Sequence, residues 1–157
     1  MRVYRLVKER YAASALDGSG ARTFGGRWNS PGTAVIYASE SIALAALELL
    51  VHLGRGAVLD SYRLFTLTLP DQAILTLDDA ALPVDWRADP APRGTADIGD
   101  GWVASGRSAA LLLPSTIIPR ERNCLLNPAH PQFAAIAAGT AEEPFGLDPR
   151  LVGGAAS

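Results

Sequence analysis

A single carboxylate interrupts the most apolar stretch of this sequence. Between Ile42 and Val51 every residue except Glu48 is apolar. Removing an isolated carboxylate from water costs several kcal/mol unless it finds a partner or becomes protonated. Glu48 therefore needs either a structural partner, such as a buried arginine, or a chemical purpose, and carboxylates in such surroundings gather at functional sites.

Three more side chains of chemical interest stand where elements of structure are expected to begin or end. Arg27 lies in the glycine-rich segment "GGRWNSPG", Tyr37 ends the apolar run "AVIY", and Ser115 follows the apolar run "AALLLP". Each also has an ordinary interpretation. Arg27 could form a surface ion pair, Tyr37 could be a core aromatic, and Ser115 could cap a turn after Pro114.

Strands are expected to position Arg27 and Tyr37. Residues 2–7 alternate between apolar and polar types, as in a half-buried strand. Residues 18–33 form a long glycine-rich connection that is expected to hold a short strand around Arg27. Residues 34–37 then predict a buried strand that ends at Tyr37.

A helix is expected to carry Glu48. Ser39 is the predicted N-cap, Glu40 is favourable in the first turn, and the helix is expected to run to Leu53, where Gly54 ends it. The remaining elements are predicted as a strand at 61–70, a loop with a helical turn at 78–92, a weak helix at 95–105, a buried strand at 109–115 and either a strand or a helix at 133–138.

Length and composition indicate one soluble globular domain, and the pattern of elements indicates that it mixes α and β structure. The chain has 157 residues, of which 48% are hydrophobic and 19% are charged, and its formal net charge is −2. These values argue against a disordered chain and against direct nucleic-acid binding. We expect the domain to span residues 1–152 and the tail, residues 153–157, to be disordered.

The sequence also argues against membrane insertion and metal binding. It shows no apolar signal-peptide core and no apolar run long enough to span a bilayer, so we expect a cytoplasmic protein. Cys124 is the only cysteine, which excludes an internal disulfide, and His52 and His130 are too far apart in sequence to predict a zinc site.

One nucleotide-binding pattern occurs but is discounted. Gly99, Gly101 and Ala104 satisfy G-x-G-x-x-G/A, and Glu121 follows about 20 residues later. No buried strand is predicted before Gly99, and Trp102 would crowd the turn that the glycines must open. No Walker A, H-E-x-x-H or G-x-S-x-G sequence is present.

Five blocks of sequence, in order, resemble those of a known family. They are "GGRWNSPGTAVIYASES", "ALAALELLVHL", "IGDGW", "LLLPSTIIPRERNCLLNPAHPQF" and "FGLDPRL". Together they resemble the RES-domain toxins of bacterial RES/Xre type II toxin–antitoxin systems. The resemblance covers nearly the whole chain.

The resemblance implies a fold, a substrate and partners. The fold is a compact α/β (α+β) domain with a mixed, mainly antiparallel sheet, similar to diphtheria-toxin-type ADP-ribosyltransferases. The substrate is NAD, which such toxins hydrolyse, phosphorolyse or use to ADP-ribosylate phosphoribosyl pyrophosphate synthetase. An Xre-type antitoxin is expected to block the active site, and a homodimer is expected within the toxin–antitoxin assembly.

The resemblance also assigns roles to residues. Arg27, Tyr37, Glu48 and Ser115 become the expected catalytic set, and the residues expected to bind NAD are Arg27, Trp28, Asn29, Tyr37, Ser115 and Asn127. A carboxylate such as Glu48 would stabilise the oxocarbenium-like transition state of nicotinamide loss. Arg27 would grip the pyrophosphate, Tyr37 would stack on nicotinamide, and Ser115 would supply a hydrogen bond rather than act as a nucleophile.

Two alternatives stay open. The ADP-ribose acceptor could be water, phosphate or a protein side chain, because the loops that decide it cannot be placed from sequence. A protein of another class, a non-catalytic module that only docks a partner in the same groove, would use the same residue types.

Overall fold

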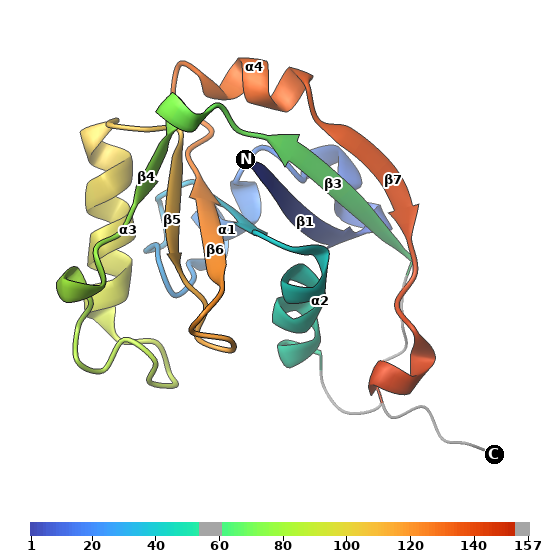
Figure 1. Ribbon diagram of the computed structural model, residues 1–157, viewed down its shortest axis with the longest axis horizontal. Coiled ribbons are helices and arrows are strands. Elements are labelled where there is room, and N and C mark those ends of the chain that lie inside the picture. Colours follow the sequence, from blue (N-terminus) through green and yellow to red (C-terminus); the bar gives the residue numbers. More distant parts are fainter. Residues whose placement is uncertain (54–60, 153–157) are drawn as a thin grey trace.

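A seven-stranded sheet organises the part of the chain that the computed structural model describes, residues 1–53 and 61–152 (Figure 1). The order across the sheet is β4-β5-β6-β2-β1-β3-β7. Only β4 and β5 pair in parallel, and every other neighbouring pair is antiparallel. The strands are β1 Arg2–Lys8, β2 Ile36–Ser39, β3 Tyr62–Thr68, β4 Ile74–Thr76, β5 Ala110–Pro114, β6 Arg122–Leu126 and β7 Ala141–Phe145. The predicted mixed, mainly antiparallel sheet is confirmed.

Short helices connect and cover the strands. The α-helices are α1 Ser19–Phe24, α2 Ile42–Val51, α3 Arg93–Ser105 and α4 Phe133–Ala138. Short 3-10 helices lie at η1 Glu9–Ser14, η2 Asp71–Ala73, η3 Asp79–Ala81 and η4 Pro149–Val152. None of the helices in the described residues has the length and apolar character needed to cross a membrane.

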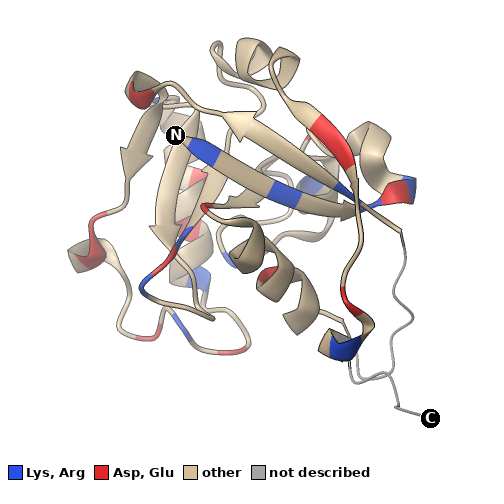
Figure 2. Cartoon of the chain, turned by 45° about the vertical axis from the view of Figure 1, so that its right-hand side comes forward, with Lys and Arg blue, Asp and Glu red and all other residues tan. Residues whose placement is uncertain are grey.

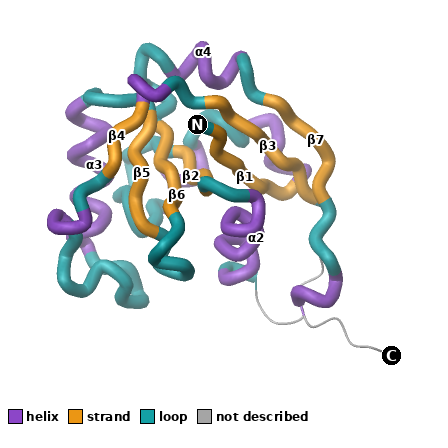
Figure 3. The backbone as a smooth tube through the Cα atoms, viewed as in Figure 1, coloured by secondary structure: helices purple, strands orange, loops and turns teal. Residues whose placement is uncertain are grey.

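The sheet is weakly joined between β1 and β2. β1 pairs with β3 along its whole length, whereas only Tyr4 and Ser39 pair between β1 and β2. In Figure 3, β4, β5 and β6 lie on one side of α2 and β7 lies on the other, while β3 passes above the helix. Ala45 of α2 packs on Leu6 and Leu64, which anchors the helix at this junction. A side chain on α2 can therefore reach the gap between the two parts of the sheet.

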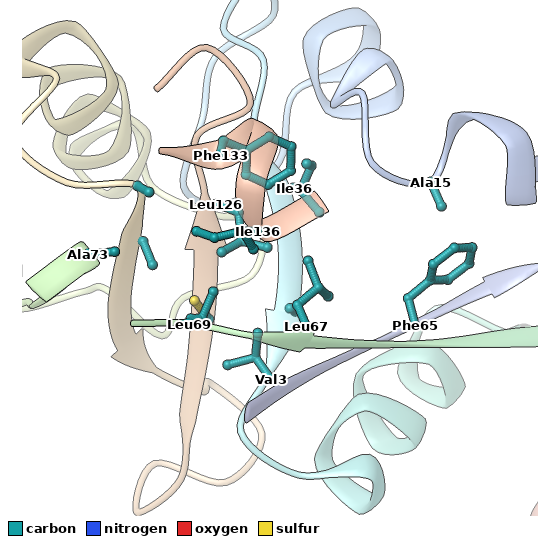
Figure 4. Packing of buried hydrophobic residues seen from close by; sticks show 14 of the residues in the cluster. Val3, Ala15, Ile36, Phe65, Leu67, Leu69, Ala73, Leu126, Phe133 and Ile136 are labelled. Carbon is teal, nitrogen blue, oxygen red and sulfur yellow. The ribbon is translucent and has the colours of Figure 1, made fainter. Parts of the chain in front are cut away.

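The other face of the sheet carries the main apolar core. Phe133 and Ile136 of α4 point toward Ile36 of β2 and Leu126 of β6 (Figure 4). Both α4 side chains are buried. Residues three apart share one face of a helix, so this spacing explains why 133–138, which periodicity left as strand or helix, folds as a helix.

The predicted start of the Glu48 helix was wrong by two residues. Ser41, not Ser39, is the N-cap, and its Oγ accepts a hydrogen bond from the N–H of Leu44 at 3.1 Å. Ser39 instead ends β2, and the Glu40 carboxylate accepts from the N–H of Arg122 at 2.6 Å. The helix ends at Val51, before the predicted Leu53, while Gly54 and the tail 153–157 lie outside the described residues.

Other elements also differ from the prediction. The strand predicted at 34–37 lies at Ile36–Ser39, and α1, β4, β6 and β7 were not predicted. The helix predicted as weak is α3, and a Cβ added at Gly99 would overlap the carbonyl oxygen of Trp28. Gly99 thus permits close packing of α3 on the segment that carries Arg27, and it lies within the helix rather than in a strand-to-helix turn.

Candidate active site

A cavity of about 750 Å³ opens beside the weak junction of the sheet. Its wall includes four of the side chains singled out in the sequence, Arg27, Trp28, Tyr37 and Glu48, together with Asn123. They come from a loop, from β2, from α2 and from β6. Segments far apart in sequence therefore converge on one hollow.

The Glu48 carboxylate is held on one oxygen only. Its Oε1 accepts hydrogen bonds from the Ser115 hydroxyl, at 2.8 Å, and from the Asn123 side-chain amide. Its Oε2 makes no hydrogen bond with any described residue, and Glu48 forms no ion pair in that part of the chain. The structural arginine partner weighed from the sequence is thus not seen, and neutral donors hold the carboxylate instead.

Ser115 lies behind Glu48 and does not line the cavity. It is fully buried, and its Oγ accepts from the N–H groups of Ile117 and Ile118, both at 3.1 Å. With its acceptor sites engaged by the backbone, the hydroxyl proton is directed to Glu48. Ser115 therefore caps a turn and orients a carboxylate at the same time, an arrangement unlike that of a serine nucleophile.

Asn123 was missed by the sequence reasoning. Its Nδ2 donates to Glu48, and its Oδ1 accepts from the Ser39 hydroxyl at 2.8 Å. Asn123 pairs with Ser39 across β6 and β2, so the sheet register brings it to the cavity. The only signal in the sequence was a polar residue directly before the apolar run "CLL", and it becomes informative only once β6 is recognised.

Arg27 is fixed at both its side chain and its backbone. Its Nη1 donates to the carbonyl oxygens of Trp86 and Ala88, at 2.8 and 2.9 Å, and its own carbonyl accepts from the Thr95 hydroxyl at 2.7 Å. The Nε and Nη2 groups make no hydrogen bond within the described residues. Arg27 thus orders a neighbouring loop and keeps donors for an anionic ligand.

The Tyr37 hydroxyl is engaged within the protein. It accepts from the N–H of Trp28 at 3.1 Å and donates to Oδ1 of Asn29 at 2.7 Å. Burial raises the pKa of this hydroxyl to about 12. A Cβ on Gly26 would lie 2.6 Å from the hydroxyl oxygen, so glycine is needed there. The phenol stays neutral, which leaves the ring as the part of Tyr37 available to a ligand.

The two asparagines expected to bind NAD have different surroundings. Asn29 is buried behind Tyr37, and its Nδ2 donates to the carbonyls of Ala21, Ser30 and Thr33. Asn127 follows the far end of β6, where its Oδ1 accepts from the N–H of Ala129 at 3.0 Å. Neither lines the cavity. Asn29 shapes the wall from behind, whereas Asn127 lies apart from the other predicted residues.

Charges of both signs surround the cavity. Besides Arg27 and Glu48, its wall contains Arg5, Arg87 and Asp89. Burial lowers the pKa of the Arg5 guanidinium to about 10. Along the described chain, Lys and Arg positions are interleaved with Asp and Glu positions (Figure 2). Within the described residues, no cluster of three or more His, Cys, Asp or Glu side chains could hold a metal ion.

Comparison with known proteins places the chain in a family. A family model described as RES domain matches residues 2–148. The chain belongs to the RES domain family. It is 45% identical over 151 residues to a Yersinia enterocolitica protein named Toxin Res, which covers 96% of this chain and 99% of that protein. It is 42% identical over 145 residues to a Sphingobium sp. protein named Prs ADP-ribosylating toxin, which covers 90% and 89% of the two chains.

The RES fold of this chain also matches a solved structure. The crystal structure of the M. tuberculosis MbcT-MbcA toxin-antitoxin complex superposes with a TM-score of 0.72, covering 96% of this chain and 86% of that chain. At 21% sequence identity this likeness concerns the fold. The resemblance to RES toxins inferred from five sequence blocks is confirmed.

Proposed function

We propose that this RES-family toxin breaks the bond between nicotinamide and ribose in NAD. The observation that carries the proposal is the Glu48 carboxylate, which is held on Oε1 by two neutral donors while Oε2 has no hydrogen-bond partner among the described residues. A negative charge fixed at a cavity wall is what a reaction through a cationic transition state requires. A module that only docks a partner has no need of such a charge without a cation beside it.

In the proposed reaction the C1′–N bond of the nicotinamide riboside breaks, and its electron pair leaves with nicotinamide. The positive charge of the pyridinium passes to the ribose, which becomes oxocarbenium-like. Oε2 of Glu48 is the available oxygen to stabilise this charge or to bind a ribose hydroxyl. An acceptor then supplies an electron pair to C1′ and loses its proton.

Arg27 and Tyr37, which line the same cavity as Glu48, would bind the rest of NAD. Arg27 retains Nε and Nη2 donors, which suit the paired anionic oxygens of a pyrophosphate. The Tyr37 ring lines the cavity while its hydroxyl is engaged elsewhere, so it would stack on the nicotinamide ring. Ser115 would act through Glu48, not by touching NAD. Asn127 would touch NAD only if the turn after β6 were rearranged.

The acceptor distinguishes two versions of the proposal. Hydrolysis or phosphorolysis of NAD would arrest growth by depleting NAD. Transfer of ADP-ribose to a protein is the second candidate, and the name of the Sphingobium relative, Prs ADP-ribosylating toxin, favours it. In that version phosphoribosyl pyrophosphate synthetase is the first protein to test.

We further propose that an antitoxin covers the cavity in the cytoplasm of the host cell. The MbcT-MbcA structure is a toxin-antitoxin complex, which supports a protein partner for this fold. Arg27 and Arg87 on the cavity wall would attract an acidic segment or a terminal carboxylate of that partner. An Xre-type partner and a paired assembly are the specific forms expected from the family.

Nicotinamide release from NAD by the purified protein tests the function. We expect release by the wild-type protein and its loss in Glu48→Gln. Mass spectrometry of the products, with and without phosphate and with candidate protein acceptors, then separates hydrolysis, phosphorolysis and transfer. A folded protein that neither releases nicotinamide nor modifies any acceptor would support the binding-module alternative.

A further inference from the structure

We infer that Asn123 is a positioning residue, which aims the Glu48 carboxylate by linking it to Ser39. The kinetic part of this inference rests on the proposed function, whereas the positional part does not. Ser39, Asn123 and Glu48 lie in β2, β6 and α2, three elements that meet only through tertiary folding. Their side chains nevertheless form one continuous chain of hydrogen bonds.

The direction of these hydrogen bonds is determined by the carboxylate. An ionised carboxylate only accepts, so the Asn123 amide must present its NH₂ group to Glu48. Its Oδ1 then faces Ser39, whose hydroxyl donates to it at 2.8 Å. Ser39 therefore donates a hydrogen bond to Asn123, and Asn123 donates one to Glu48. Ser115 donates a further hydrogen bond to the same carboxylate oxygen.

The consequence is an asymmetric carboxylate. Both donors act on Oε1, so the plane of the group is fixed from two directions and Oε2 remains for a ligand. Asn123 also lines the cavity, unlike Ser115. Charge-assisted hydrogen bonds of this kind hold a catalytic group in place before the substrate arrives, which avoids reorganisation during the reaction.

Neither alanine nor aspartate can make both contacts that the Asn123 amide makes. Alanine would remove the donor to Glu48, and aspartate would replace that donor with a second carboxylate. Two carboxylates at hydrogen-bond distance cannot both stay ionised without a large cost, so one proton would be retained between them to higher pH. The other ionisable groups on the cavity wall are Tyr4, Arg5, Arg27, Tyr37, His52, Arg87 and Asp89.

The test compares Asn123→Asp and Asn123→Ala with Gln132→Glu. The control makes the same change from amide to carboxylate at an exposed position on the opposite side of the molecule, next to α4 (Figure 1). For Asn123→Ala we expect kcat for nicotinamide release to fall about 10-fold with KM within about 2-fold. For Asn123→Asp we expect the acid limb of the pH–rate profile to shift to higher pH by about one unit. At pH values above this limb, activity should be partly restored.

A structural role alone would give a different pattern. The melting temperature would then fall and the rate would decline equally at every pH, with the limb unmoved in Asn123→Asp. An unmoved limb in a folded Asn123→Asp protein, or a full rate in Asn123→Ala, would overturn the inference. The control should match the wild-type protein throughout.

Crystal structures of wild-type protein and Asn123→Ala keep this test separate from the proposed function. We expect the Glu48 carboxylate to leave its place beside Ser115 in the variant. If wild-type protein released no nicotinamide but the carboxylate moved as expected, the proposed function would fail and the positioning role would stand. A carboxylate that stays in place without Asn123 would refute the positioning role, whatever the activity.

Discussion

The two walls of the cavity are built differently. Glu48 projects from a helix and is held by side chains of β6 and of the turn after β5, through hydrogen bonds between side chains. Arg27 lies in an irregular segment, and among the described residues its side chain donates only to backbone carbonyls of another irregular segment, at Trp86 and Ala88. The part of the wall around Glu48, the Glu48 wall, therefore belongs to regular secondary structure. The part around Arg27, the Arg27 wall or loop wall, consists of irregular segments that hydrogen-bond to each other.

This difference matches the work proposed for each wall. A charge that stabilises a transition state must be placed within a fraction of an ångström, which favours regular elements with packed neighbours. A side chain that binds a flexible dinucleotide can tolerate small changes in its own position, and loops allow such changes. Variants in the Glu48 wall should thus affect the rate of the chemical step, and variants in the Arg27 wall should affect substrate binding or the stability of the loops.

The largest effect is expected for Glu48→Gln. Glutamine keeps an oxygen that can accept from Ser115 and Asn123 but lacks the negative charge, so turnover should fall about 100-fold or more. The melting temperature should stay close to that of wild-type protein, because Glu48 forms no ion pair with any described residue. Glu143→Gln, an exposed change on β7, is the control. If the Glu48→Gln protein still cleaved NAD but had a lower melting temperature, Glu48 would not be a catalytic residue.

Gly99→Ala should disrupt the segment that carries Arg27, although Gly99 itself does not line the cavity. A Cβ at this position would overlap the Trp28 carbonyl oxygen, so α3 and the Arg27 segment must separate. We expect a loss of about 3 kcal/mol in unfolding free energy, measured by denaturant titration. Gly101→Ala is the matched control, because nothing lies within 4 Å of a Cβ there. It should stabilise α3 slightly, and equal effects of the two changes would contradict the packing argument.

The sequence predicted the apolar elements better than the polar ones. The strand at 2–7 and the helix around Glu48 were found because periodic apolar residues report which face is buried. β7 was missed because its sequence, "AEEPF", is polar and contains proline, and it forms as an edge strand paired only with β3. The N-cap of the Glu48 helix was misplaced because Ser39 and Ser41 are both good N-caps, and the pairing of β2 with β6 decides between them.

The site shows the same limit. Glu48 could be found because one carboxylate in an apolar run is conspicuous, and the family resemblance singled out Arg27 and Ser115. Asn123 has no local signal, because its role depends on the register of β6 against β2. The hydrogen bond from Arg27 to the loop at Trp86 could not be predicted from the sequence either, since it joins residues 59 positions apart.

Tyr37→Phe should weaken the loop wall in a pH-dependent way. At neutral pH the change leaves the Trp28 N–H and the Asn29 side-chain oxygen without their partner, at a cost of about 1–2 kcal/mol. Because the pKa of Tyr37 rises to about 12 in the folded protein, wild-type protein loses stability as pH rises from 10 toward 12, where only the unfolded chain ionises. That loss is about 2 kcal/mol, and the Tyr37→Phe variant cannot show it because phenylalanine does not ionise.

The stability difference between the two proteins should therefore shrink or reverse above pH 10. Arg5, whose pKa is also shifted, is present in both and cancels in the comparison. Urea unfolding at pH 8, 10 and 11 measures the difference. A constant difference across this range would mean that the Tyr37 hydroxyl titrates normally and is less sequestered than its contacts with Trp28 and Asn29 indicate.

Arg27→Lys should have the smallest effect, and that effect should be on substrate binding. Lysine keeps the positive charge but has a single ammonium group, which cannot bind the Trp86 and Ala88 carbonyls and also present two parallel donors to a pyrophosphate. We expect KM for NAD to rise about 10-fold while kcat changes less than about 3-fold. Steady-state kinetics measure both, and Arg93→Lys, an exposed change at the start of α3, is the control. A fall in kcat at constant KM would place Arg27 with Glu48 in the chemical step, and the contrast between the two walls would be wrong.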